Sequence, residues 1–198
     1  MSSEESTKKQ ILESAYHLFI ERGFSGSSMR DIAKNAGIKA ASIYNHFENK
    51  DQIFEAVFIE RHPLFRILEI LGGISGNSAE ELLTNAANRL FKELREDSKL
   101  LNLFFVEIVE MNGKHVEKAI NTNFPEDSDF IRQIYKLKSE VRNIPIPVMI
   151  RSLIGAVFAN VVFSWFVGKG NLKRWGTQSQ MVDVLLRGIL EKQELPHS

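Results

Sequence analysis

The segment SMRDIAKNAGIKAASIYNHF, residues 28–47, decides the fold of this chain. Its first residue, Ser28, can accept a hydrogen bond from the unpaired backbone N–H groups at a helix start, and Asp31 stands three positions on, as in a capping box. Gly37 favours the left-handed conformation that ends a helix at little cost. The segment therefore predicts two short helices that turn at Gly37, and the sequence directly after it predicts the start of a further helix.

The second of these short helices has one apolar face. Ile38, Ile43 and Phe47 are spaced to bury against the first helix. Two short helices joined by a tight turn are typical of a helix-turn-helix DNA-binding unit, and we refer to residues 28–50 as the reading head. The candidate DNA-binding residues lie on its outer surfaces and are Ser28, Arg30, Lys39, Ala40, Ala41, Ser42, Tyr44, Asn45, His46 and Lys50.

The chemistry of these side chains suggests two kinds of contact. Lys39 and Ser42 can donate hydrogen bonds to base edges, while Ala40 and Ala41 can meet a thymine methyl group. Lys50 also lies beside a helix N-terminus, which attracts anions. Phosphate contacts are expected from Ser28, Arg30, Tyr44, His46 and Lys50. The alternative is a helical hairpin that never meets DNA, which leaves the exposed cations without a role.

The same residues carry a resemblance to a known family. In order and spacing, the chain resembles the TetR family of transcriptional regulators through the motifs RDIA (30–33), AGI (36–38), SIY (42–44), HF (46–47) and NKD (49–51). The resemblance covers residues 7–59, and many members have Ser or Thr in place of Lys39 and Gly in place of Ala41. It implies a homodimeric regulator, a repressor that a small-molecule effector releases from its double-stranded DNA operator.

Length and composition fit two helical domains. A chain of 198 residues can hold a small DNA-binding module and a larger domain, each with its own core. We expect an all-α fold with a three-helix helix-turn-helix domain over residues 1–50. A helical effector-binding and dimerisation domain should occupy residues 51–198, with a linking helix from about residue 49.

Charge and cysteine content narrow the class of protein. The chain has 25 basic and 25 acidic residues, but the segment from Arg30 to Lys50 carries Lys34 and Lys39 as well, against two acidic residues. Such a local excess attracts phosphates, and a dimer with half-sites about 34–36 Å apart would compensate for weak binding by one module. The absence of cysteine and of a secretory signal at the acidic start MSSEE predicts a cytoplasmic protein.

Capping residues and apolar spacing place the other helices. They are predicted from Thr7 to Gly23, from Asn49 to Pro63, from Ser78 to Leu94, and over residues 98–111, 129–137, 147–167 and 177–193. Pro63 should kink its helix or restart it as a new first turn. The three glycines of residues 72–77 predict a flexible linker.

The segment from Pro147 to Val167 is apolar almost throughout, and its length is compatible with a membrane span. Arg151 and Asn160 argue against a span, because a charge within a lone spanning helix costs a few kcal/mol. A buried helix of a soluble domain is therefore preferred. Together with the one-sided final helix, it is expected to pack against a second copy of the chain as a four-helix dimer seam, which the resemblance also implies.

Patterns that indicate catalysis or metal binding are scarce. The chain has no glycine-rich phosphate loop, paired catalytic acids or serine elbow. Glu107 and Glu110, close to His115, fall on the polar side of their helix and are expected to face solvent. We therefore predict no enzyme activity, no cofactor and no metal site. A small helical enzyme or a protein-binding adaptor for hydrophobic partners is the alternative.

Aromatic side chains are numerous beyond the reading head. Each one taken singly is typical of an ordinary core, but the resemblance implies an effector enclosed among the helices of the second domain. As a set they suggest an apolar effector, aromatic or acyl, with a few polar anchors. The candidate ligand-binding residues are Phe91, Phe104, Phe105, Glu107, Met111, Phe124, Arg151, Phe158, Asn160 and Trp165.

Overall fold

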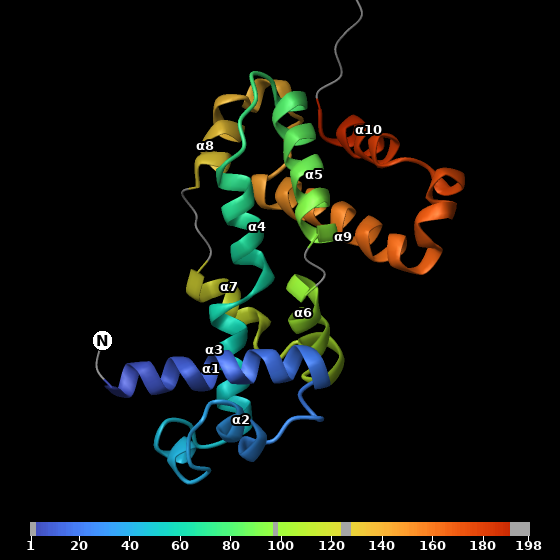
Figure 1. The fold of residues 1–198 in the computed structure, drawn as a ribbon. Coiled ribbons are helices and arrows are strands. Elements are labelled where there is room, and N and C mark those ends of the chain that lie inside the picture. The colour runs from blue at the N-terminus through green and yellow to red at the C-terminus, as the bar shows by residue number, and fades with distance from the viewer. Residues whose placement is uncertain (1–2, 97–98, 124–127, 191–198) are drawn as a thin grey trace, which may run out of the picture. The chain divides into compact units, whose positions relative to one another are not determined.

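The computed structural model describes residues 3–96, 99–123 and 128–190, and these ranges are helical apart from turns and loops (Figure 1). No β-strand occurs in them. Their one sheet-like contact is an isolated antiparallel bridge between Val141 and Leu190. The predicted all-α fold is confirmed.

By packing, the chain forms two compact units. Unit 1 comprises residues 1–66 and 98–124, and unit 2 comprises residues 67–97 and 125–198. The boundary lies inside α4 (Pro63–Gly72). The boundary predicted at residue 50 separates a DNA-binding part of the sequence from an effector-binding part, and it does not coincide with this packing boundary. The functional roles of the two parts stay a prediction.

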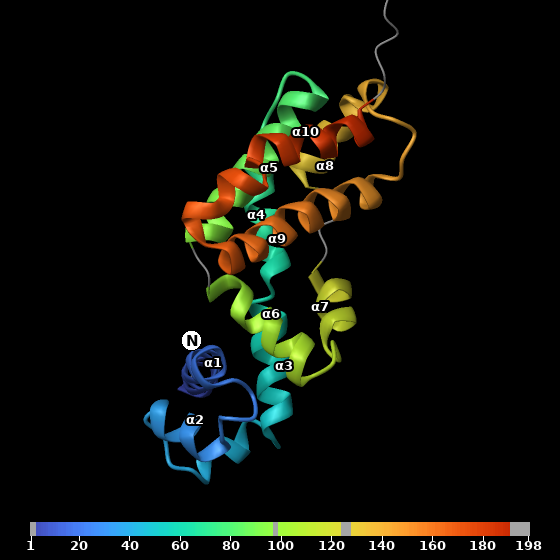
Figure 2. The ribbon, with the colours of Figure 1, turned by 90° about the vertical axis from the view of Figure 1, so that its right-hand side faces the viewer.

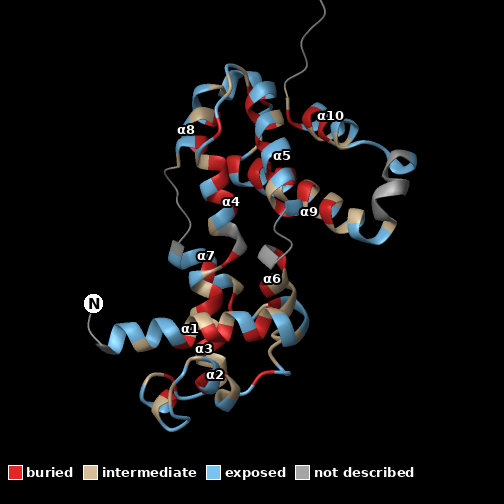
Figure 3. Ribbon diagram, in the orientation of Figure 1, coloured by how far each residue is buried: buried red, intermediate tan, exposed pale blue. Residues whose placement is uncertain are grey.

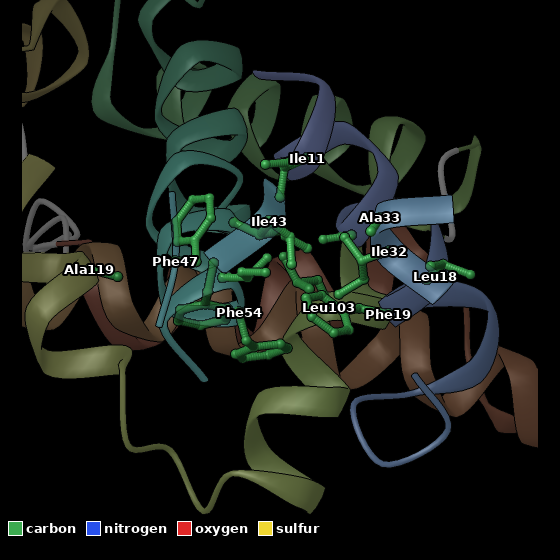
Figure 4. Close-up of a cluster of buried hydrophobic side chains, with 14 residues drawn as sticks. Ile11, Leu18, Phe19, Ile32, Ala33, Ile43, Phe47, Phe54, Leu103 and Ala119 are labelled. Atoms are coloured by element: carbon green, nitrogen blue, oxygen red, sulfur yellow. The ribbon is translucent and has the colours of Figure 1, made fainter. Parts of the chain in front are cut away.

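Unit 1 is built around one apolar core. Its helices are α1 (Ser3–Arg22), α2 (Met29–Asn35), the 3-10 helix η1 (Ser42–Asn45), α3 (Lys50–Glu60), α6 (Lys99–Glu110) and α7 (Val116–Asn123). Figure 4 shows side chains of this core, with Phe19 from α1, Ile43 from η1 and Phe54 from α3. Leu103 and Ala119 join the same cluster. Two helices distant in sequence from α1 and α3, namely α6 and α7, therefore complete the core of unit 1.

Unit 2 is built on contacts among three of its helices. It contains most of α4, then α5 (Ala79–Glu96), α8 (Asp129–Lys136), η2 (Lys138–Glu140), α9 (Ile146–Asn171), η3 (Leu172–Trp175) and α10 (Gln178–Ile189). Helices α5, α9 and α10 contact one another (Figure 2). The predicted apolar face of α5 is buried in full and consists of Ala79, Leu82, Leu83, Ala86, Ala87, Leu90 and Leu94.

Most predicted helix starts are confirmed, with one correction. Asn49 caps α3, because its side chain accepts a hydrogen bond from the Gln52 N–H at 2.9 Å. Pro63 starts α4 as a new helix. The start predicted at Thr7 is wrong, since α1 begins at Ser3. Its first turn holds two glutamates, which stabilise a helix N-terminus.

The second helix of the reading head is shorter than predicted. Only the four residues Ser42–Asn45 are helical, as the 3-10 turn η1, and the side chain of the preceding Ala41 makes no capping bond. Ser, Ile, Tyr and Asn are all weaker helix formers than Ala or Leu. Without a capping side chain, such a short sequence does not form a longer α-helix.

The glycine-rich segment 72–77 connects α4 to α5, as predicted for a linker, but it is packed within unit 2. Its residues all belong to unit 2, and Ile74 within it is buried. The Gln133 side chain donates a hydrogen bond to the Ile74 carbonyl oxygen at 2.7 Å. At Gly76, an added Cβ would lie 2.4 Å from the Leu82 nitrogen. The glycine is needed here for close packing rather than for flexibility.

Helix α9 is less buried than predicted (Figure 3). Within residues 146–167, the most apolar 18-residue window has a mean hydropathy of 1.9, and only 33% of this window is buried. By length and composition this one helix could span a membrane, which is weak evidence for a span. Trp165 is 43% exposed and Phe166 is 83% exposed. The exposed apolar side chains leave α9 with a surface for a further contact.

His62, between α3 and α4, is expected to make the stability of unit 1 depend on pH. Its ring packs against Phe58 at 4.7 Å, and burial lowers its pKa from 6.5 to about 4. The unfolded chain binds this proton below pH 6.5 and the folded chain only near pH 4, so the free energy of unfolding should fall as pH drops through that window. We expect this ring to account for a loss of about 2 kcal/mol.

Urea unfolding at neutral pH and at about pH 4.5 measures this loss. The variant His62→Leu has no ring to protonate, so its stability should fall less between the same two pH values. Equal losses in the variant and the wild type would assign the pH dependence to other groups.

Candidate nucleic-acid interface

The backbone of the reading head turns as the sequence predicts. The Ser28 hydroxyl oxygen accepts a hydrogen bond from the Asp31 N–H at 3.1 Å and caps α2. Gly37 has a φ of 71°, which is the left-handed region, and the next residue, Ile38, donates its N–H to the Ala33 carbonyl oxygen at 3.0 Å. Gly37 therefore reverses the direction of the chain, and the residues after it run back toward α2.

Buried side chains hold the reading head to the core and leave its outer surface free. Ile32, Ala33 and Ile43 have no exposed surface, and α2 contacts η1. Seven of the ten predicted DNA-binding residues are exposed, namely Ser28, Arg30, Lys39, Ala40, Ala41, Tyr44 and Asn45. Ser42, His46 and Lys50 are half-buried.

Lys50 makes contacts inside unit 1 that the sequence analysis missed. Its Nζ donates hydrogen bonds to the carbonyl oxygens of Phe24 at 2.6 Å and Ser27 at 2.7 Å, and it lies 4.1 Å from the centre of the Phe24 ring. Burial lowers the pKa of Lys50, and the nearby carboxylate of Glu110 partly offsets this. Two of the three N–H donors of the ammonium group are thus used on backbone carbonyls.

Glu110, at the end of α6, holds the same turn between α1 and α2, residues 23–27. Its carboxylate accepts hydrogen bonds from the N–H groups of Phe24 at 3.0 Å and Ser25 at 2.7 Å. Burial raises the pKa of Glu110. This effect is outweighed by the hydrogen bonds from Ser25 and Phe24 and by the charge of Lys50, so the pKa of Glu110 lies below its usual value. A residue predicted to face solvent instead binds the turn that precedes the reading head.

Glu107 is fully buried, so its predicted exposure is wrong. Its carboxylate accepts a hydrogen bond from the His115 N–H at 2.6 Å and lies 2.9 Å from His115 Nδ1. His115 Nε2 lies 3.8 Å from a carboxylate oxygen of Asp51, and Lys114 donates to the other oxygen at 2.7 Å. The hydrogen bond from Lys114 lowers the pKa of Asp51. A buried carboxylate is tolerated because a ring and a backbone N–H pair with it.

Unit 2 contains a small cavity beside α5, α9 and the start of α10. Its volume is about 120 Å³, and it is lined by Phe91, Arg95, Asn160, Val161, Ser164, Gly176, Thr177 and Gln178. Phe91 and Asn160 were among the predicted ligand-binding residues. An apolar cavity of about 150 Å³ can bind benzene, so this cavity has room for a group of about that size.

The other predicted ligand-binding residues are not brought to this cavity. Arg151 and Trp165 are exposed and Phe158 is half-buried, all on α9. Phe104, Phe105, Glu107 and Met111 belong to unit 1, where Phe104 and Met111 pack against the core. Phe124 lies outside the described residues. The ligand-binding role of these eight residues stays a prediction.

A family model matches the reading head and the helices around it. The model of the bacterial regulatory proteins of the tetR family matches residues 11–57, which include α2, η1 and most of α1 and α3. Over these residues the chain is similar to the TetR family. This match supports the DNA-binding helix-turn-helix unit predicted for residues 28–50.

Two relatives and one solved structure match more of the chain. The chain is 30% identical over 129 residues to the "Probable HTH-type transcriptional regulator YttP" of Bacillus subtilis, which covers 65% of this chain and 56% of that protein. It is 20% identical over 197 residues to the "Probable acrEF/envCD operon repressor" of Escherichia coli, with 96% and 89% covered. A TetR-family regulator structure from Haemophilus influenzae matches with a TM-score of 0.66 at 17% identity, covering 96% of this chain and 100% of that one, and shares the fold.

Proposed function

We propose that this chain is a TetR-family transcriptional repressor that binds operator DNA as a homodimer and is released by a small-molecule effector. The observation that carries the proposal is the exposed surface of the reading head. Arg30, Lys39 and Tyr44 are exposed above the buried Ile32 and Ile43. A rigid, cationic surface of this kind is what contacts to phosphates and base edges require.

The proposed homodimer uses the last two long helices. Large apolar side chains are exposed on α9 and α10, among them Phe163, Trp165, Phe166 and Val184. An exposed apolar surface of several such residues marks an interaction site. In a dimer two reading heads can bind neighbouring half-sites together, which one head alone cannot do.

The proposed effector binds in the cavity of unit 2. Phe91 and Val161 offer apolar contacts there, and Arg95, Asn160 and Ser164 offer hydrogen bonds. An effector that enters this cavity would present a group about the size of a ring, with a polar atom for one of these side chains. The proposal includes no catalytic activity, and it places the protein in the cytoplasm with the DNA that it regulates.

Titration with duplex DNA of random sequence distinguishes the proposed regulator from an enzyme or an adaptor for hydrophobic partners. A regulator that contacts six or more phosphates should lose affinity on the order of a thousandfold between about 50 and 200 mM salt. An enzyme or an adaptor has no reason to show this dependence. Absence of binding at the lower salt concentration would overturn the proposal.

Lys39→Ala should change the DNA sequence that the protein prefers. Lys39 is exposed at the start of the second half of the reading head, where a lysine can donate to guanine. Sequences selected from fragmented genomic DNA by the variant should lose a base preference at one position of each half-site, equivalent to about 1–3 kcal/mol.

The matched control is Lys34→Ala, which removes an exposed cation from α2. It should leave the selected sequence unchanged, because any contact that Lys34 makes with a phosphate carries no sequence information. If Lys39→Ala and the wild type select the same sequences, Lys39 does not read a base.

A further inference from the structure

The turn between α1 and α2, residues 23–27, is held from two sides. Glu110 of α6 binds two of its N–H groups, and Lys50 of α3 binds two of its carbonyl oxygens. The turn is also closed internally, because the Ser27 hydroxyl donates to the Gly23 carbonyl oxygen at 2.8 Å. Four backbone groups of one short turn are therefore bound by two charged side chains.

Gly23 makes room for this arrangement. Its φ is 74°, and an added Cβ would lie 2.5 Å from Glu110 Oε1. Any other residue would be strained in its backbone and would meet the carboxylate. The glycine that ends α1 therefore also allows Glu110 to approach the N–H groups of Phe24 and Ser25.

We propose that Glu110 and Lys50 are positioning residues of the reading head, which set the direction of α2 without touching DNA. The inference rests on the proposed DNA-binding function. Ser27, whose carbonyl oxygen binds Lys50, directly precedes Ser28, which caps α2. The two charged side chains therefore act on the residues that determine where α2 begins.

Further contacts attach the chain that follows α6 to α3. Lys118 pairs with Glu55, and Lys114 binds Asp51. The buried pair of Glu107 and His115 holds the end of α6 to the chain before α7. Because α6 is fastened to both α3 and the turn, a change in the direction of α6 within unit 1 reaches the reading head through Glu110.

The variant Glu110→Gln tests the role of Glu110, with Glu117→Gln as the matched control. Both remove one negative charge from residues 99–123, and Glu117 is exposed on α7. Loss of a negative charge alone should leave DNA binding equal or slightly tighter, which we expect for Glu117→Gln. Glu110→Gln can accept only one of the two N–H groups, so it should bind about tenfold more weakly, with an unchanged salt slope because no phosphate contact is lost.

Lys50→Met tests the other side of the turn with the same probe, a duplex that the wild type has selected from genomic DNA. A positioning role predicts weaker binding with the salt slope unchanged, whereas a phosphate contact predicts a slope lower by about 0.9. Equal affinities of Glu110→Gln and Glu117→Gln, or this lower slope, would overturn the inference. If the wild type binds no duplex at all, the proposed function falls, and the inference with it.

A third test uses the wild-type protein and so does not depend on the folding of a variant. The amide signals of Phe24 and Ser25 should shift together on acidification, at a pH below the usual glutamate pKa, because the Glu110 carboxylate that they bind has a lowered pKa. Their hydrogen exchange should also be slower than that of unbonded turn amides. Two amides that exchange freely and do not titrate would overturn the inference.

Discussion

Phe54→Ala should lower the free energy of unfolding by about 3–5 kcal/mol. The Phe54 ring is fully buried and lies 5.1 Å from the ring of Phe19, 5.4 Å from that of Phe24 and 6.0 Å from that of Phe58. Alanine would lose the favourable burial of the ring and leave a cavity between α1 and α3. Because these rings come from α1, the turn after it and α3, the cavity cannot close without moving the backbone.

Urea unfolding of the variant and the wild type measures this cost. Tyr44→Ala is the matched control, because it also deletes an aromatic ring from unit 1, but one that is 58% exposed. Its free energy of unfolding should stay within about 0.5 kcal/mol of the wild type. A loss below about 1 kcal/mol for Phe54→Ala would show that the core around α3 repacks more easily than its ring contacts indicate.

The parts of the fold that the sequence predicts are those set by residues within a few positions of one another. Gly37 turns the chain because only its own φ is involved, and Asn49 caps α3 through the N–H of Gln52, three residues on. The apolar face of α5 follows from helical spacing alone. In each case, the physical cause lies within one or two helical turns, where a sequence pattern can show it.

The parts that the sequence does not predict depend on distant partners. Glu110 appeared to be solvent-facing because it is charged and lies on the polar side of its helix, yet its partners Phe24 and Ser25 are 86 and 85 residues away. Glu107 appeared exposed for the same reason, although its contacts with His115 offset the free-energy cost of burying the carboxylate. No pattern within α6 shows which of its carboxylates will meet a backbone N–H.

The candidate ligand-binding residues show a second limit. They were grouped because they are aromatic or polar and follow the reading head in sequence, but α6 packs in unit 1 and α5 and α9 pack in unit 2. Phe104 is therefore part of the core around α3, whereas Phe91 and Asn160 line a cavity. Composition predicts that a chain has apolar surface to bury, but not which helices will bury it together.

Phe166→Glu should convert the proposed dimer into a folded monomer. Phe166 lies on α9 and is 83% exposed, so a glutamate there has little effect on the packing within one chain. In a four-helix seam, the same carboxylate would face its copy in the partner and lose its water, which costs several kcal/mol for an unpaired charge. Sedimentation of the variant should therefore give the mass of one chain.

The affinity of Phe166→Glu for a selected duplex should fall by about a hundredfold or more, because two reading heads that are joined bind their half-sites as one unit. Val109→Glu is the matched control, since it places the same charge on an exposed apolar position, 75% exposed, of α6. It should remain dimeric and bind DNA nearly as the wild type does. If Phe166→Glu sediments as a dimer, the seam does not include this face of α9. If the variant is monomeric but keeps full affinity, the two reading heads act independently, and the exposed apolar face has a role other than joining them on DNA.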